Sequence, residues 1–541
     1  MKKTSSFHIL KYVLLTYLTA TVAFPILRLF AGIRGRHIAD IVAADQFLPM
    51  LGNSLLTTLM ATVISVGLAF LLAYLLARSR IRFKSLWMVL FTVPMLIPSI
   101  SHGMGLVLLL GDNGILTNLL HMNVGLYGYP GIIMGSVLYS FPVAFLLFYD
   151  SFQYEDFTTY ESARVLGLSG GRQFLTITLP NMKQAIVSSV LSVFTMVFTD
   201  YGVPLMTGGT VMTLPVYMYR EVIGMMNFEG GAVVGVILLL PAVICFILDL
   251  KKSNAVNVSS TVSKPYAIAE NRGRDIFVYV VFFTALFILC LPILAFLMLS
   301  FVKQYPIDMH FTLDNVKKLL SGGIGMYLLN SLAVALATAF VGTCLSYFSA
   351  YVTARSGKKP SNGLLHFISM LSLAIPGVVL GLSYVLAFHT LPIYSTIFIL
   401  IVVNIVHFYS SPYLLAYNCL TKFNPNLEDV AQSLRISRMR MLFAVYVPST
   451  VPTMIEMYSY FFVNAMITIS AVSFLANFRT TTLALMIPQL ESQSFIEGTA
   501  LVSLMILCLN LLEKGIAFFA KRYAVMHGDH AVLKNEPEME R

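Results

Sequence analysis

The chain of 541 residues is 57% hydrophobic and only 11% charged, and its formal net charge is +10. Soluble domains carry about 25% charged residues, so the composition excludes a soluble protein and predicts an all-α integral membrane protein. Spanning strands would be shorter and would alternate in polarity along the chain, which excludes a membrane barrel.

Twelve apolar stretches follow one another along the chain, and each is long enough to cross a hydrocarbon layer of roughly 30 Å as a helix. They run approximately over residues 10–32, 53–77, 86–111, 130–150, 183–206, 230–250, 276–302, 328–354, 363–390, 393–417, 451–476 and 498–520. Basic and then apolar residues open the chain without a small-residue cleavage site, so we interpret the first stretch as an uncleaved span.

The basic residues are distributed unevenly between the two sides of the membrane. If the N-terminus is cytoplasmic, the inside segments hold 27 of the 35 Lys and Arg residues and the outside segments hold 8. This positive-inside bias predicts both termini in the cytoplasm. The basic excess is therefore a topology signal and gives no reason to expect a nucleic-acid partner.

The second half of the chain repeats the first. The span that opens N-S-L-L-T-T at Asn53 has an echo that opens N-S-L-A-V-A at Asn330, and both end in A-Y-x-x-A-R-S. Such repetition predicts two parallel repeats of six spans, related by an axis along the membrane normal, with the pathway between them. The expected units are a first repeat 1–250 (core 53–250), a cytoplasmic linker 251–275, a second repeat 276–525 (core 328–520) and a charged cytoplasmic tail 526–541.

Two polar segments, 158–180 and 426–448, interrupt the apolar chain after spans four and ten. They align on their last prolines, and both are predicted as two short helices joined by a bend. Thr158 and Glu161 have the T-x-x-E spacing of a capping box. The paired positions are Glu161 and Asp429, Ala163 and Ala431, Gly167 and Arg435, and Pro180 and Pro448.

The first of these segments reads E-x-A-x-x-x-G, then twelve residues, then P, which resembles the EAA signature of permease subunits in bacterial binding-protein-dependent ABC importers. The resemblance implies a fused two-unit permease of the type I fold in the bacterial inner membrane. It also implies that the paired positions above form cytoplasmic coupling helices, on which two ATPase subunits act. The second copy departs from the signature, because Arg435 stands at the glycine position and would be strained there if the backbone needs a positive φ.

The resemblance further implies an extracytoplasmic binding protein that delivers the solute, and alternating access driven by ATP. The chain has no G-x-x-x-x-G-K-[ST] phosphate loop, so ATP would be bound by the partner and this chain would carry no cofactor of its own. Its contact with lipid follows from the spans. Histidines and the five scattered cysteines lack metal-ligand spacing and are expected to be packing residues.

Two acids fall within predicted spans and are candidates for the substrate pathway or a gate, since an intramembrane carboxylate is costly. Asp200, followed by Tyr201, lies toward the outer end of its span, and Glu456 lies nearer the cytoplasmic end of its own. A helix-end acid with a local partner is the alternative for Asp200. Neither acid has an acidic counterpart in the other half.

Only the resemblance to particular branches of the family narrows the choice of solute. The stretches T-D-Y-G-V-P (199–204) and G-M-M-N-F-E-G-G-A-V-V-G-V-I-L-L-L-P-A-V (224–243) look most like the 2-aminoethylphosphonate branch of the fused permeases, with ferric iron as the alternative and thiamine a further one. Two other classes of protein remain open. An ion-coupled secondary transporter would need paired intramembrane charges, and a membrane-embedded enzyme would need clustered His or acids at a membrane surface.

Overall fold

A computed structural model describes residues 5–33, 35–122, 124–253, 264, 266–357 and 360–533. Of the predicted linker, residues 254–263 and 265 lie outside this part, and so do residues 534–541 of the predicted tail and residues 1–4 at the N-terminus. The described part is helical apart from turns and one antiparallel hairpin, which pairs Val302 with Phe311. The prediction of an all-α membrane protein is therefore confirmed.

The first repeat runs from α1 to α15 and includes short π and 3₁₀ turns between its helices. In order the elements are α1 (Ser5–Leu18), η2 (Thr19–Ala23), α2 (Phe24–Ala31), α3 (Gly35–Val42), α4 (Phe47–Arg78), α5 (Lys84–Thr92), η3 (Val93–Leu96), α6 (Ser99–Leu110), α7 (Ile115–Leu120), α8 (Tyr129–Gln153), α9 (Thr158–Val165), α10 (Gly170–Gln173), η4 (Phe174–Thr178), α11 (Leu179–Asn181), α12 (Lys183–Phe198), α13 (Gly202–Thr207), α14 (Leu214–Tyr219), η5 (Arg220–Gly224) and α15 (Phe228–Ser253).

The second repeat follows the same order, with a hairpin added after its first helix. Its elements are α16 (Arg272–Ser300), β1 (Val302–Gln304), β2 (Asp308–Phe311), α17 (Asp314–Ser321), α18 (Ile324–Arg355), α19 (Pro360–Leu371), η6 (Ser372–Ala374), α20 (Gly377–Phe388), α21 (Ile397–His407), α22 (Ser410–Thr421), α23 (Leu427–Ser433), α24 (Arg438–Met441), η7 (Leu442–Tyr446), α25 (Val447–Ser449), α26 (Val451–Ile467), α27 (Leu483–Ser492) and α28 (Ile496–Leu533).

The predicted spans are present, but several are broken. Within the described residues, eight helices are long and apolar enough to cross a membrane, or eleven if each of three bent pairs counts as one span. The stretch 451–476 is occupied by α26, which has 17 residues. The stretches 86–111 and 363–390 break at Pro98 and Pro376, which occupy matching places in the two repeats. Proline removes a backbone donor and disfavours helix in the residue before it, and the second break bends the chain by 113°.

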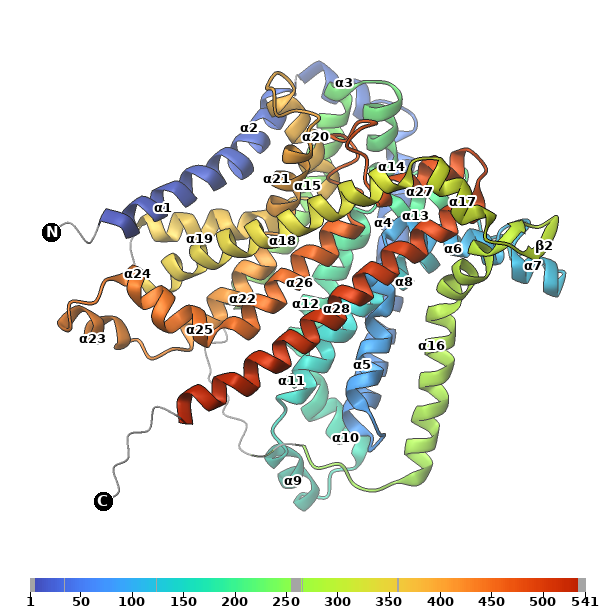
Figure 1. Ribbon diagram of the computed structural model, residues 1–541. Coiled ribbons are helices and arrows are strands. Elements are labelled where there is room, and N and C mark those ends of the chain that lie inside the picture. The colour runs from blue at the N-terminus through green and yellow to red at the C-terminus, as the bar shows by residue number, and fades with distance from the viewer. Residues whose placement is uncertain are drawn as a thin grey trace.

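The first helix of each repeat packs on the other repeat (Figure 1). The Tyr384 hydroxyl on α20 donates to the Thr21 carbonyl, 2.8 Å away, in the first helix of the chain. In the opposite direction, Phe282 on α16 lies edge-on to Trp87 and Phe91, with ring centroids 5.2 and 5.1 Å apart. This exchange joins the repeats into a single body.

The short polar helices gather at one end of the bundle. In Figure 1, α9 and α10 lie at the bottom and α23 and α24 at the left, below the start of α1, whereas α3 lies at the top and α7 and the hairpin at the right. The long helices α4 and α18, with 32 residues each, connect the two ends in their respective repeats.

Candidate functional site

The two polar loops fold into the same succession of elements, in the register read from the sequence. The π-helical turns η4 and η7 begin at residues 174 and 442, and the short helices α11 and α25 begin at 179 and 447, so both pairs keep the offset between Pro180 and Pro448. These prolines lie in the first turn of α11 and α25, where a missing N–H is tolerated. The chain ends α11 at Asn181, directly after Pro180, and bends by 61° into α12.

The bend between the two short helices is also the same in both loops. Gly167 has φ +72° and Arg435 has φ +56°. The amide of Leu168 donates to the Ala163 carbonyl over 3.0 Å, and the amide of Ile436 donates to the Ala431 carbonyl over 2.8 Å. These are the closing bonds of a Schellman motif, which places a left-handed residue after a helix. Arg435 therefore adopts the glycine conformation without being glycine.

The predicted capping box at the start of α9 is wrong. Phe157 holds the N-cap position, and the carboxylate of Asp156 accepts from the amide of Thr158 over 3.0 Å. Glu161 instead accepts from Lys264 Nζ over 2.5 Å. The extra acid two residues before Thr158 competes for the helix start, which the spacing alone did not reveal.

The alanine in the short first helix of each loop is turned inward. Ala163 and Ala431 are buried in their own loops, with 4% and 6% of their surface exposed. Among the exposed apolar residues of the loops, Leu166 and Leu434 occupy equivalent positions and are 78% and 65% exposed. A pair of exposed leucines beside the bends, rather than the alanines, lies on the outward surface of the two loops.

A buried arginine clamp joins the first loop to the end of α4. The Arg78 guanidinium forms an ion pair with Glu155, and the two side chains are 8% and 3% exposed. The Tyr160 hydroxyl lies 3.1 Å from Arg78 Nη2, donates to Glu155 over 3.0 Å and lies 2.8 Å from Thr178 Oγ1. These contacts tie α4, α9 and η4 together.

An equivalent clamp joins the second loop to the end of α18. Arg355 Nε donates to Glu428 over 2.7 Å and to the Tyr446 hydroxyl over 3.1 Å, and its remaining nitrogens donate to the Phe423 and Asn424 carbonyls. Burial, and then the neighbouring Glu428, raise the pKa of Tyr446 to about 12, so the phenol stays protonated. The arginines match in the repeat, whereas the tyrosine and glutamate come from other positions.

A strap from the linker covers the first loop. The Tyr266 ring lies over the Arg78 guanidinium at 3.2 Å and edge-on to Phe157 and Tyr160 at 5.0 Å each. The Phe157 amide donates to the Lys264 carbonyl over 3.0 Å. Sequence reasoning missed this strap, because Tyr266 stands alone in a polar linker.

The far ends of α4 and α18 are anchored in the same way. The Ser54 hydroxyl accepts from the Leu214 amide over 2.8 Å, and the Ser331 hydroxyl accepts from the Leu483 amide over 2.7 Å. Residues 54 and 78 are separated by about 36 Å along a helix that rises 1.5 Å per residue. Each long helix therefore connects a loop clamp to the segment that follows the broken span of its own repeat.

Tyr201 lies at the contact between the repeats. Its hydroxyl donates to the Ile469 carbonyl over 3.5 Å, and its ring stacks on Tyr219 with centroids 4.7 Å apart. Ile469 is the position that aligns with Tyr201, so a residue and its counterpart meet, as they must close to a pseudo-two-fold axis. The expected axis between the repeats thus passes near the break after α12.

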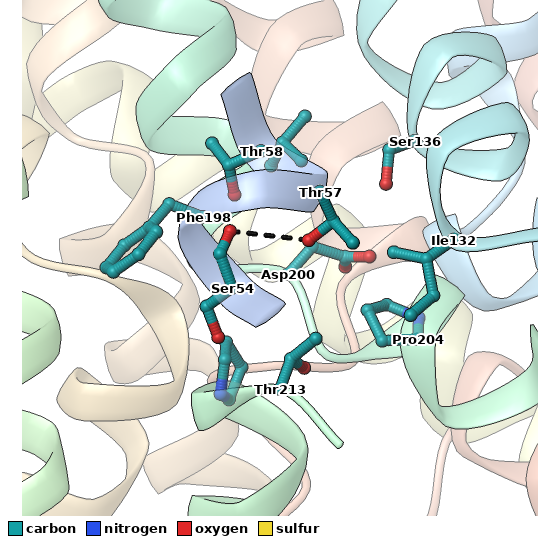
Figure 2. Close-up of a pocket in the computed structure, with 11 residues that line it drawn as sticks. Ser54, Thr57, Thr58, Ile132, Ser136, Phe198, Asp200, Pro204 and Thr213 are labelled. Carbon is teal, nitrogen blue, oxygen red and sulfur yellow. Dashed lines mark hydrogen bonds between the residues drawn. The ribbon is translucent and has the colours of Figure 1, made fainter. Parts of the chain in front are cut away.

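Asp200 occupies the break between α12 and α13. The break ends the predicted span 183–206 early, and Asp200 accepts from the amides of Gly202 and Val203 over 3.3 and 3.0 Å. Its side chain remains partly accessible from a small polar pocket (Figure 2). The structure thus combines local capping with accessibility, and a pathway role stays a prediction.

Glu456 is placed differently from Asp200. It forms an ion pair with Lys521 of α28, and both side chains are close to half exposed. Sequence reasoning missed a more buried acid, Glu513 on α28, which accepts from the Ser459 hydroxyl over 2.8 Å and is 8% exposed. The sequence could have revealed this acid, since Glu513 lies within the predicted membrane span 498–520. Nothing in these contacts favours Glu456 as a pathway residue.

The described residues contain no group of three or more His, Cys, Asp or Glu side chains that could hold a metal ion. His102 Nε2 lies 3.0 Å from the Pro94 carbonyl, a packing contact between α6 and the end of η3. The site therefore consists of loops, clamps and a contact between repeats, an arrangement suited to transmitting motion.

The fold and the paired loops define a membrane transport subunit built from two repeats. A family model described as the binding-protein-dependent transport system inner membrane component matches residues 65–250 and 342–520. The chain belongs to this family, with one copy of the component in each repeat. The resemblance read from the EAA signature is thereby confirmed, and the chain is a transport permease and not an enzyme.

Individual relatives align across both repeats. A protein named as a ferric transport system permease, FbpB 1 of Haemophilus influenzae, is 27% identical over 71% of this chain and 63% of its own length. The ferric transport system permease protein FbpB of Actinobacillus pleuropneumoniae is 26% identical over 71% of this chain and 58% of its own. The molybdenum transport system permease protein ModB of Haemophilus influenzae matches 26% of this chain. The chain thus spans less than two thirds of the length of the two ferric relatives.

Proposed function

We propose that this ABC permease imports ferric iron delivered by an extracytoplasmic binding protein. The observation that carries the proposal is the alignment with two ferric transport permeases across both repeats, whereas the molybdenum relative aligns with only about a quarter of the chain. The comparisons favour this solute over 2-aminoethylphosphonate, which the sequence stretches 199–204 and 224–243 suggested first.

Uptake of radioactive iron by cells that express the chain with its transport partners tests the solute. We expect uptake of ferric iron that depends on the chain and is unaffected by a hundredfold excess of 2-aminoethylphosphonate. Melting of the cognate binding protein gives a second measure, because a ligand stabilises the state that it binds. A shift in the melting temperature with the phosphonate and none with ferric iron would overturn the proposal and identify the phosphonate as the solute.

We further propose that two ATPase subunits act on the loops 158–180 and 426–448 from the cytoplasm. The exposed Leu166 and Leu434, each beside a bend of fixed geometry, support this role, as does the grouping of both loops at one end of the molecule (Figure 1). On this proposal Glu161 and Asp429 are ATPase contacts, Ala163 and Ala431 pack each helix onto its loop, and Gly167 and Arg435 set the bend.

The clamps give the loops a path to the membrane core. A displacement of α9 moves Tyr160 and Glu155, which are bonded to Arg78 at the end of α4, and α23 is bonded to α18 in the same way through Glu428 and Arg355. Since Ser54 and Ser331 anchor the far ends, each long helix acts as a rod from its loop to the contact between the repeats. A partner shifts the two conformations only through its different affinity for them.

A further inference from the structure

One small pocket lies in the first repeat, beside the break at Asp200 (Figure 2). Its volume is about 10 Å³, roughly the space of one water molecule. Its oxygen-bearing side chains come from α4, α8, the break after α12 and the segment before α14; they are Ser54, Thr57, Thr58, Ser136, Asp200 and Thr213.

The oxygens of this pocket include a carboxylate and several hydroxyls that can accept or coordinate. The Thr57 hydroxyl donates its proton to the Asn53 carbonyl, 2.8 Å away. Toward the pocket, this hydroxyl can therefore only offer a lone pair. Asp200 uses some of its roughly four lone-pair positions on its two capping amides and on the Ser99 hydroxyl, and at least one position is left over. Thr213, only 3% exposed, lines the pocket with a hydroxyl that has no hydrogen-bond partner within the described residues. A carboxylate surrounded by hydroxyl oxygens suits a cation, and the carboxylate disfavours an anion.

The carboxylate also has no positive partner. Among the described residues, no Lys, Arg or His nitrogen lies within 4.0 Å of Asp200. A charge placed this deep in a membrane protein is costly unless it is neutralised. Broken membrane helices are places where exposed backbone and side-chain oxygens coordinate small monovalent cations.

The second repeat keeps the architecture of this region but lacks the carboxylate and the two threonine hydroxyls of α4. Ser331 caps Leu483 as Ser54 caps Leu214, so the serine has a structural role that both repeats share. At the positions that match Thr57, Thr58 and Asp200 in the first repeat, the second repeat has Val334, Ala335 and Thr468. The extra oxygens are therefore not needed to build the fold.

We propose that this pocket binds one small monovalent cation of the sodium class, held by Asp200 with Thr57, Thr58, Thr213 and Ser136. The pocket adjoins Tyr201, whose hydroxyl bonds the carbonyl of Ile469 in the other repeat. A bound ion neutralises the carboxylate at this contact and stabilises the arrangement of the repeats described above.

Thermal unfolding of the purified full chain in detergent tests the proposal, with sodium, potassium or choline chloride at equal ionic strength. Sodium at a hundredfold excess over its Kd is expected to raise the unfolding midpoint by about 2–3 °C relative to choline. Binding of radioactive sodium should saturate at one ion per chain. Asp200→Asn should abolish both effects.

A second variant keeps the test decisive if Asp200→Asn does not fold. Thr57→Val combined with Thr58→Ala installs the residues of the second repeat and should weaken sodium binding at least tenfold. Ser331→Ala is the matched control, which should lower the midpoint but retain the full sodium shift. Equal midpoints in sodium and choline for the wild-type chain, or an undiminished sodium shift in the Thr57 and Thr58 variant, would overturn the proposal.

Discussion

The two coupling loops share a backbone and differ in how it is held. In the first, glycine makes the bend, a linker strap covers the clamp, and Glu161 is paired with Lys264. In the second, Arg435 makes the same bend, and Asp429 is exposed without an ion pair in the described part of the chain. The clamp there is held by carbonyls of its own loop instead. The two loops thus reach one backbone geometry through two different sets of contacts.

The largest expected difference between the loops concerns their clamps. Arg78→Ala leaves Glu155 buried and unpaired, which should cost about 3–5 kcal/mol of unfolding free energy. Arg355→Ala should cost less, because Glu428 is 17% exposed and Glu155 only 3%. Denaturation of the two purified variants compares them. Arg78→Leu with Glu155→Leu should recover most of the loss, and an equal loss in both single variants would refute the comparison.

Charge reversal at the proposed ATPase contacts comes next. Glu161→Arg should lower ATP-driven uptake at least tenfold, about 1.4 kcal/mol, while insertion into the membrane is unchanged. Asp429→Arg should act in the same direction. Thr159→Arg adds a positive charge to an exposed position of the same helix and should leave uptake near the wild-type rate. Undiminished uptake in the Glu161 variant would exclude its assigned role.

The strap should stabilise the first loop and leave the stability of the second loop unchanged. Tyr266→Ala removes an aromatic face from a desolvated guanidinium, which should cost about 2 kcal/mol of unfolding free energy. Tyr266→Phe keeps the face and should cost little. Hydrogen exchange then locates the effect: faster exchange is expected in α9 and not in α23. A uniform change in both loops would show that the strap is not specific to the first.

The smallest effect concerns the bend of the second loop. Arg435→Gly relieves a left-handed residue and should raise the unfolding free energy by about 0.5–1 kcal/mol. Arg435→Ala keeps the strain and should bring no gain, so the pair separates strain from the guanidinium. If the glycine variant is more stable and yet loses coupled ATPase activity, Arg435 also serves as a contact to the partner.

The sequence predicted the features that repeat in it. The loops, their common register on Pro180 and Pro448, and the positive φ that Arg435 would need are all visible as patterns. Features that depend on positions unmatched between the repeats were missed. Glu155 and Glu428 each pair with the arginine of a clamp, although they do not align in the repeat, and Tyr266 lies in a linker without a pattern. The break at Asp200 was missed because its apolar flanks read as one continuous span, although capping by a carboxylate favours a new helix start there.

The central claim is that a separate ATPase moves solute through this chain by way of its two loops. Proteoliposomes that contain the chain and its ATPase subunits, with the binding protein outside, test it directly. Uptake of ferric iron should require ATP at the ATPase side and should stop when Glu161→Arg and Asp429→Arg are combined. Uptake by the chain alone on an ion gradient, without ATPase or ATP, would contradict the account.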